Sequence, residues 1–358
     1  MIDPAIKPFC VRPHSLLRDV IACIDRNEKG IALVTDDDGH LLGTITDGDM
    51  RRGILAGLAP DAELEVLLQR RKAEFAKPIT APAGTDRARL LEIMRESQVR
   101  QIPLLDDDSR VVGLVTTDEL MPEHVLPLRA VIMAGGRGQR LYPLTETTPK
   151  PMLPVGDRPL MEHTIRHLRD AGIKNVSITT HYRPEEISKH FRDGHDFGVA
   201  VEYVRENEPL GTAGSLALLR KSGEPLLVIN GDVLTRVDFK AMLAYHRDHK
   251  ADMTVGVRKY DLNVPYGVIQ CDDIEVREVV EKPMYSFLVN AGIYLIEPSV
   301  CDVVPLDRRF DMTDLIGVLV SQRRKVISFP ILEYWLDVGR PKDYQQAQKD
   351  IQQWEKNP

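Results

Sequence analysis

Residues 130–156 decide the fold: Ala130-Val-Ile-Met-Ala-Gly-Gly-Arg-Gly-Gln-Arg-Leu-Tyr-Pro-Leu-Thr145 is followed, after two residues, by Thr148-Pro-Lys-Pro-Met-Leu-Pro-Val-Gly156. The apolar run 130–133 predicts a buried parallel strand. It leads directly into Gly135-Gly-Arg-Gly138, where missing side chains let backbone N–H groups approach a phosphate chain. The stretch therefore predicts an α/β fold with a phosphate-binding turn after a buried parallel strand.

Two cations in the same stretch, Arg140 and Lys150, are suited to meet the negative charge of a polyphosphate. Other phosphate-binding motifs fit poorly. A dinucleotide fingerprint needs a third glycine, and Gln139-Arg140-Leu141 follows Gly138 instead. A P-loop needs Gly-Lys-Ser or Gly-Lys-Thr, and neither tripeptide occurs.

The complete pattern, closed by Pro149-Lys-Pro-Met-Leu-Pro154, resembles the signature of sugar-1-phosphate nucleotidyltransferases, the nucleotide-sugar pyrophosphorylases. The resemblance covers about residues 128–350. It implies catalytic roles for Arg140 and Lys150. It also implies nucleotide contacts from the turn, at Met133, Ala134, Gly135, Gly136 and Gly138.

Strand-like and helix-like segments alternate after residue 128. Strands are expected at 130–133, 176–180, 199–204 and 226–230, with helices near 160–171, 184–190 and 213–220. Such alternation indicates a parallel sheet, with ligands outside the carboxyl ends of its strands. Together with the resemblance, it predicts a Rossmann-like mixed α/β sheet, similar to the GT-A fold, over residues 128–358.

Two carboxylates are expected to hold a metal ion. Leu227-Val-Ile-Asn-Gly-Asp232 places a carboxylate after an apolar strand, and Trp335-Leu-Asp337 resembles the second metal segment of the same family. Two carboxylates, phosphate oxygens and water suit Mg²⁺. Asp232 and Asp337 are therefore predicted as catalytic metal ligands and Mg²⁺ as the cofactor.

Further motifs resemble the base and sugar segments of the family. Pro209-Leu-Gly-Thr-Ala-Gly-Ser215 looks like the base-reading loop and implies that Gly211 and Thr212 contact the nucleotide. Glu281-Lys-Pro, Tyr266-Gly-Val-Ile and Asn290-Ala-Gly-Ile-Tyr resemble its sugar-phosphate segments. The resemblance implies sugar-phosphate contacts at Gly267, Glu281, Lys282 and Asn290.

The N-terminal third is an internal repeat with a displacement of 70 residues. Ser15 corresponds to Thr85, both expected helix N-caps, and Gly43 corresponds to Gly113. Each half is expected to run helix, short strand, Asp-rich turn, strand, helix.

Gly43-Thr-Ile-Thr-Asp-Gly-Asp49 and Gly113-Leu-Val-Thr-Thr-Asp-Glu119 resemble the end of a CBS motif. An α+β tandem CBS pair is therefore expected over residues 1–125, in halves of about 8–60 and 75–124. The resemblance implies an adenine or guanine nucleotide bound by Thr46, Asp49, Thr116 and Glu119. Glu119 departs from the family Asp. A pair that only dimerises or spaces the enzyme is the alternative.

Composition excludes several other classes. The 358 residues suffice for two or three domains, and a net charge of −7 argues against a nucleic-acid partner. No apolar run approaches a membrane span and no signal peptide is recognisable, so a cytoplasmic location is expected. Four scattered cysteines are expected to be buried thiols, and Glu162-His163 with His167 lacks the order of a zinc site.

The sequence thus predicts a Mg²⁺-dependent transferase that joins an NTP and a sugar 1-phosphate, regulated by the CBS pair and homo-oligomeric through it. The order of domains resembles glucosamine-1-phosphate guanylyltransferases of legionaminic acid synthesis, which favours GTP and glucosamine 1-phosphate. UTP, dTTP or CTP with mannose, glucose or heptose 1-phosphate are the alternatives. A catalytically silent nucleotide-sugar sensor is less favoured, because Arg140, Lys150, Asp232 and Asp337 are all retained.

Overall fold

The structure, a computed structural model, describes residues 4–27, 29–69, 77–120, 125–220, 222–306 and 308–356. Its contacts divide the chain into two units, residues 1–124 and 125–358. None of the helices described is both long and apolar enough to cross a membrane.

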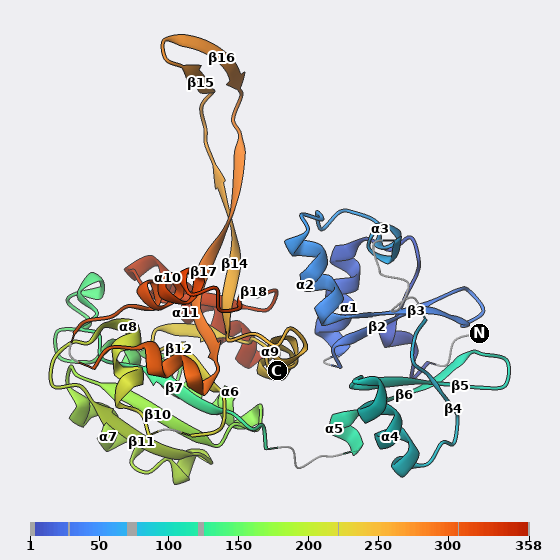
Figure 1. Ribbon diagram of the computed structural model, residues 1–358, viewed down its shortest axis with the longest axis horizontal. Coiled ribbons are helices and arrows are strands. Elements are labelled where there is room, and N and C mark those ends of the chain that lie inside the picture. The colour runs from blue at the N-terminus through green and yellow to red at the C-terminus, as the bar shows by residue number, and fades with distance from the viewer. Residues whose placement is uncertain are drawn as a thin grey trace. The chain divides into compact units, whose positions relative to one another are not determined.

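The first unit repeats one arrangement twice (Figure 1). Strands β1 (Cys10–Val11), β2 (Ile31–Thr35) and β3 (Leu41–Thr46) form one three-stranded sheet, and β4 (Ala81–Pro82), β5 (Gln101–Leu105) and β6 (Val111–Thr116) form the other. The helices are α1 (Leu17–Asn27), α2 (Asp47–Leu55), α3 (Leu64–Gln69), α4 (Arg87–Ser97) and α5 (Thr117–Leu120). The predicted order of elements is confirmed in both halves.

The registers of the two sheets show the same displacement of 70 residues. Ile31 pairs with Thr46 as Gln101 pairs with Thr116, and each hairpin has a register shift near its turn. The halves are joined by a bridge between His40 and Arg110. The repeat therefore extends to backbone pairing.

The expected N-caps of this unit are wrong. Helix α4 is capped by Asp86, whose side chain accepts from the Arg89 N–H, while the Thr85 hydroxyl donates to the Pro82 carbonyl. Ser15 lies two residues before α1 and accepts from the Arg12 N–H. In α4 the N-cap is Asp86, the residue after Thr85, because an Asp side chain caps a helix as well as a Thr side chain does.

The second unit is built on a seven-stranded sheet in the order β11-β10-β7-β12-β17-β14-β18. The first four are mutually parallel: β11 (Ala200–Arg205), β10 (Asn175–Thr180), β7 (Arg129–Met133) and β12 (Leu226–Asn230). Strand β17 (Met284–Ile296) is antiparallel to both of its neighbours, β12 and β14 (Met253–Asn263), and β18 (Val326–Pro330) is parallel to β14. The predicted Rossmann-like mixed α/β fold is confirmed, with the strand expected at 199–204 displaced by one residue.

Apolar cores lie on both faces of this sheet, because alternate residues of each buried strand point to opposite sides. Ala130 and Ile132 pack with one cluster, which includes residues of α6 (Leu160–Asp170), α7 (Pro184–Phe191) and α9 (Phe239–Asp248). Val131 packs with the other, which includes residues of α10 (Met312–Ser321). The interior strand β7 is thus packed on both faces, which holds its carboxyl end in place.

One predicted helix is shorter than expected. The segment 213–220 forms a single α-turn, α8 (Gly211–Gly214), and then a 3₁₀ turn (Ser215–Leu218), and Leu219 is extended. The N–H groups of Ala213 and Gly214 both donate to the Phe310 carbonyl. This attachment pins the start of the segment to the chain before α10, and the buried Ser215 hydroxyl donates to Met133 Sδ at 3.3 Å.

The C-terminal segment adds a small sheet and a helix. Strand β19 (Trp335–Asp337) pairs with β13 (Val233–Thr235), and α11 (Pro341–Lys356) begins at a proline, a residue suited to the first helical position. Residues of α11 pack in a separate apolar cluster with β13.

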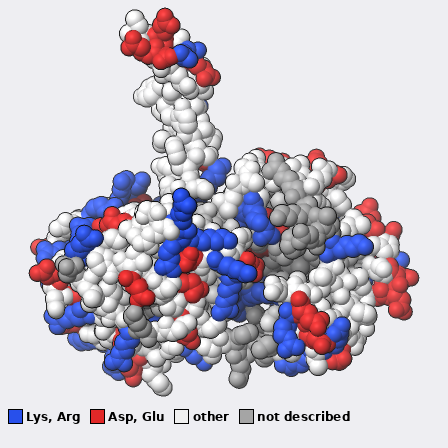
Figure 2. Space-filling view, in the orientation of Figure 1, with Lys and Arg blue, Asp and Glu red and all other residues white. Residues whose placement is uncertain are grey.

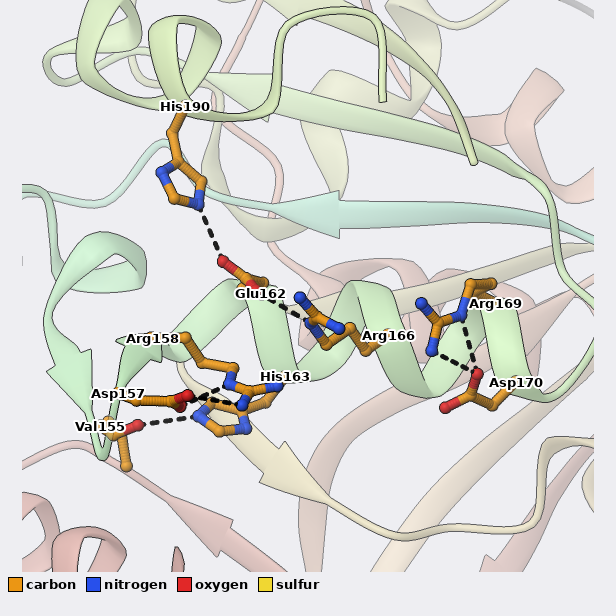
Figure 3. Close-up of polar contacts among 9 residues, drawn as sticks. All are labelled: Val155, Asp157, Arg158, Glu162, His163, Arg166, Arg169, Asp170 and His190. Carbon is orange, nitrogen blue, oxygen red and sulfur yellow. Dashed lines mark hydrogen bonds and ion pairs between the residues drawn. The ribbon is translucent and has the colours of Figure 1, made fainter. Parts of the chain in front are cut away.

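The two histidines of helix α6, whose spacing could suggest a zinc site, contact backbone carbonyl groups instead. His163 Nε2 lies 2.9 Å from the Val155 carbonyl oxygen (Figure 3), and His167 Nε2 lies 2.9 Å from that of Val237. The buried Glu162 carboxylate binds Arg166 on the same helix and His190 of α7. These contacts join α6 to the elements around it.

A two-stranded arm projects from the sheet (Figure 1). We define the arm as residues 258–289, in which β14 pairs only with β17, because the pairing of β18 ends at Val257. Strands β15 (Val268–Asp272) and β16 (Glu275–Val280) form its tip. Exposed Cys271 lies on the arm, so the expectation that all four thiols are buried is wrong.

Candidate active site

The glycine turn leaves β7 at the carboxyl edge of the sheet. Gly138 has a φ of +64°, and a Cβ there would lie 2.9 Å from Lys150 Cβ, so a side chain is disfavoured on both grounds. A Cβ at Gly136 would meet nothing within 4 Å. In the described part of the chain, the N–H groups of residues 135–138 donate to no protein acceptor. Successive N–H groups of this kind form a concave site for an anion.

Asp232 is brought to this turn by the neighbouring strand. The Gly231 N–H donates to the Met133 carbonyl at 2.9 Å, and a Cβ on Gly231 would lie 2.7 Å from that oxygen. Because a side chain would collide with that oxygen, only glycine fits at position 231. The next residue, Asp232, therefore starts beside the end of β7. The backbone thus places Asp232 beside the glycine turn, where the sequence predicted it.

Asp337 reaches the same place from far downstream. It pairs with Val233 across β13 and β19, and the next residue, Val338, donates its N–H to the Asp232 carbonyl at 3.0 Å. Two carboxylates separated by about a hundred residues of sequence are therefore neighbours in the fold.

The two predicted cations share this environment. Lys150 Nζ lies 2.5 Å from Asp232 Oδ2, and the Lys150 side chain is 9% exposed. Burial, and then the negative charge of Asp232, raise the pKa of Asp337, while Lys150 and Arg140 oppose the rise. The structure thus brings Arg140, Lys150, Asp232 and Asp337 into one electrostatic group, which we call the carboxylate–cation cluster.

The cluster has the donor set of a Mg²⁺ site. Asp337 Oδ1 is buried without a hydrogen-bond partner in the structure. An unpaired buried carboxylate oxygen is costly, and a hard divalent cation is a ligand that would satisfy it. Asp337 with Asp232 therefore fits Mg²⁺, with Lys150 as the present partner of one Asp232 oxygen.

The loop expected to read the base is held rigidly. A Cβ on Gly211 would lie 2.6 Å from Asp311 Oδ1, and its φ is +83°. The Thr212 N–H donates to that same carboxylate oxygen at 2.9 Å, and its hydroxyl accepts from the Met312 N–H. Thr212 is thus occupied in fixing the loop to the start of α10.

Glu206, which none of the sequence motifs included, lies immediately after β11. It is buried, and burial raises the pKa of its carboxyl group. One oxygen, Oε2, accepts from the Leu210 N–H at 3.1 Å, and Oε1 lies 3.2 Å from where a Cβ on Gly135 would stand. Its position directly after a parallel strand is the sequence feature that could have identified it, because ligands bind at the carboxyl ends of such strands.

The predicted sugar-phosphate residues separate into two places. Gly292, with a φ of +69°, brings its backbone against Asn230, and the Gly292 N–H donates to the Asn290 side chain, so Asn290 lies near the end of β12. Gly267 and Glu281 lie together at the arm, where a Cβ on Gly267 would be 3.0 Å from Glu281 Oε2.

Lys282, the remaining predicted sugar-phosphate residue, is 66% exposed beside Glu281. The arm on which it lies stands away from the sheet (Figure 1). The structure therefore does not bring Gly267, Glu281 and Lys282 to the carboxylate–cation cluster of the same chain.

In the first unit, the four predicted ligand residues form two helix caps. The Thr46 N–H donates to Asp49 Oδ2, and the Asp49 N–H donates to the Thr46 hydroxyl. Thr116 and Glu119 make the same two bonds, so the Glu that departs from the family Asp preserves the capping box. Glu119 also forms an ion pair of 2.8 Å with Lys29 of the first half.

Family models match both units of the chain. The family model described as nucleotidyl transferase matches residues 129–354, so the chain belongs to that family. The CBS domain model matches residues 2–56 and 73–123.

Individual relatives match about three fifths of the chain. The mannose-1-phosphate guanyltransferase of Kluyveromyces lactis is 37% identical over 230 residues, which are 61% of this chain and 63% of that protein. The enzyme of the same name from Candida albicans is 37% identical over 61% of this chain and 62% of its own. This chain thus spans less than two thirds of the length of these relatives.

A similar solved structure is HddC from Yersinia pseudotuberculosis. It has a TM-score of 0.50 and 27% identity, over 62% of this chain and 99% of that one. A second structure of it is complexed with GMP-PN.

Proposed function

We propose that this member of the nucleotidyl transferase family transfers a nucleotidyl group from an NTP to a sugar 1-phosphate. The carboxylate–cation cluster beside the glycine turn is the observation that carries the proposal. Its four members come from three distant segments of the chain, around residues 140–150, 232 and 337, and together they complement the charge of a triphosphate and offer oxygen ligands for Mg²⁺. We assign this reaction to residues 128–358.

In the proposed reaction, an oxygen of the sugar phosphate attacks the α-phosphorus of the NTP. A new P–O bond forms as the bond to the β-phosphate breaks, and pyrophosphate leaves. The unpaired N–H groups of residues 135–138 hold phosphate oxygens, while Arg140 and Lys150 stabilise negative charge on the leaving group. Mg²⁺ bound by Asp232 and Asp337 supplies further charge neutralisation.

GTP is the favoured nucleotide because of Glu206. The guanine edge carries two adjacent donors, N1–H and the N2 amino group, which a carboxylate accepts together. Uracil and thymine offer one donor between two acceptors, which suits an amide better than a carboxylate. A buried carboxylate adjoining Gly135 therefore supports guanine. The names of the guanyltransferase relatives point to the same base.

The sugar is less constrained. Glucosamine 1-phosphate is the first candidate from the order of domains, and mannose 1-phosphate is the second, from the names of the relatives. Pyrophosphate release should be measured with GTP, UTP, dTTP, CTP and ATP against glucosamine, mannose, glucose and heptose 1-phosphates. The proposal expects release with GTP and one of the first two sugars. Release with none of these combinations would contradict it, and preference for another NTP would remove GTP alone.

We also propose that residues 1–125 bind a purine nucleotide that changes the rate of transfer. The two capping boxes place Thr46 and Thr116 at equivalent helix starts, where backbone N–H groups favour an anion. Calorimetry with AMP and ATP should show binding that Asp49→Ala abolishes. Asp86→Ala is the control, because it removes a capping carboxylate at the start of another helix, at a cost of about 0.5–2 kcal/mol. Equal heats in both variants would leave the repeats as a spacer or an oligomerisation element.

A further inference from the structure

The stem of the arm has one apolar and one mixed face. In an antiparallel pair, residues directly opposite each other point to the same side of the ribbon. Tyr260 lies opposite Phe287 and Leu262 lies opposite Tyr285, and all four are exposed. On the other side, Lys259 is opposite Leu288, Asp261 opposite Ser286 and Asn263 opposite Met284. We call the first set, Tyr260, Leu262, Tyr285 and Phe287, the aromatic face.

An isolated ribbon with such a face is expected to be covered. A two-stranded hairpin is marginally stable alone in water and gains stability by packing its apolar side on another surface. The four side chains of the aromatic face are between 37% and 54% exposed. On the side seen in Figure 2, a length of the stem shows no charged side chains, and charged residues, mostly acidic, gather at the tip. A contiguous apolar surface of this kind marks an interaction site.

The pairing of the stem argues against a fold back onto the same chain. Between Val257 and Asn263 the register with β17 runs without a break, and the one shift, at Val255/Val257, lies where β14 is still paired with β18. A bend within the stem would have to disrupt continuous ladder hydrogen bonds. The sugar-phosphate motif at Glu281 and Lys282 is thus held away from its own carboxylate–cation cluster.

Two exposed apolar side chains near the carboxylate–cation cluster are suited to pack against the aromatic face. Tyr142 and Leu144, which lie two and four residues after Arg140 in the chain, are 50% and 45% exposed. Both are large apolar side chains close in sequence to the proposed phosphate site. Both are exposed rather than packed in a hydrophobic core. An arm that packed there would bring its tip to the sugar side of the site.

We propose that two copies of this chain exchange arms. The aromatic face of one copy docks beside Tyr142 and Leu144 of the other, and its Lys282 binds the sugar phosphate at that copy's carboxylate–cation cluster. The contact is reciprocal, so each dimer holds two shared sites. This inference rests on the proposed function for the role of Lys282, and it adds that each site is incomplete without the second copy.

Mixed dimers test the exchange directly. Asp337→Asn removes the cluster of its own chain but leaves an intact arm, and Lys282→Ala leaves an intact cluster with a defective arm. Each variant alone should be strongly deficient at a low concentration of sugar phosphate. Co-expressed full chains carrying one variant each should regain roughly one quarter of wild-type activity, since half of randomly paired dimers are mixed and each has one complete site. Activity equal to the mean of the two separate variants would overturn the exchange.

A second measurement covers the case in which either single variant stays active. That result would contradict the proposed role of Asp337 or Lys282, and the arm is then judged by molecular mass. Phe287→Glu should lower the mass of the full chain in sedimentation at low protein concentration, because losing the arm contact weakens association even where the N-terminal repeats also hold two copies together. Leu288→Glu should not, because that neighbouring residue is equally exposed, at 50% against 51%, but lies on the opposite face. The same mass in both variants would overturn the docking of the aromatic face.

Discussion

Replacing Glu206 by Gln changes the charge beside the glycine turn while almost preserving its shape. In the protein, Oε2 accepts from the Leu210 N–H and Oε1 is directed toward Gly135. The amide oxygen of Gln can still accept from Leu210, which then leaves its NH₂ group facing the nucleotide. Two donors of guanine would meet a donor, so the favourable contact is lost and an unfavourable one replaces it.

The expected loss is that of one hydrogen bond to a charged group, about 1.5–3 kcal/mol. At 1.4 kcal/mol per tenfold change, this lowers kcat/KM for GTP roughly 10- to 150-fold. The value for UTP should fall less or rise, because an NH₂ group suits a uracil carbonyl. Burial raises the pKa of Glu206, so the neutral Gln should not destabilise the fold.

The assay is pyrophosphate release at limiting GTP or UTP with the preferred sugar 1-phosphate in excess. Glu208→Gln is the control, since it makes the same chemical change at an exposed position two residues away. If Glu206→Gln kept the wild-type ratio of kcat/KM for GTP and UTP, Glu206 would not read the base and the argument for GTP would be lost.

Three further predictions concern the same unit. Asp337→Asn should lower kcat at least about 100-fold at saturating Mg²⁺ with an unchanged melting temperature, because a metal ligand worth several kcal/mol is removed; near-normal turnover would exclude it as a ligand. Arg140→Ala should lower kcat, and Lys282→Ala should mainly raise KM for the sugar phosphate, whose charge is present before reaction; an altered KM for the NTP in the Lys282 variant would contradict the sugar-side assignment. Burial lowers the pKa of His167 and His246 in the folded protein, so the unfolded chain binds more protons below about pH 6.5. The free energy of unfolding, from urea titrations, should therefore fall between pH 7 and pH 5.5, and a rise over this interval would refute the effect.

The sequence was sufficient for the parts of the fold that local pattern controls. The strand before the glycine turn follows from a short apolar run, and the order of elements in each half of the repeat follows from local periodicity. The carboxyl-edge rule also brought Asp232 to the turn correctly, since parallel strands end at one edge.

Other features depend on contacts that no local pattern encodes. The segment 213–220 is short because a carbonyl of residue 310, almost a hundred positions away, binds its first N–H groups. Glu206 is significant only because the fold buries it against Gly135. The Glu281-Lys-Pro motif was readable, but its position on a projecting arm follows from where the pairing of β18 stops.

The most direct test of the account identifies the products. GTP and glucosamine 1-phosphate or mannose 1-phosphate should be incubated with the full chain and Mg²⁺, and the phosphorus-containing products followed by ³¹P NMR. The account predicts a GDP-sugar and pyrophosphate in equal amounts, both lost in Asp337→Asn. Hydrolysis of GTP to GDP and inorganic phosphate, or equal product formation by Asp337→Asn, would contradict it.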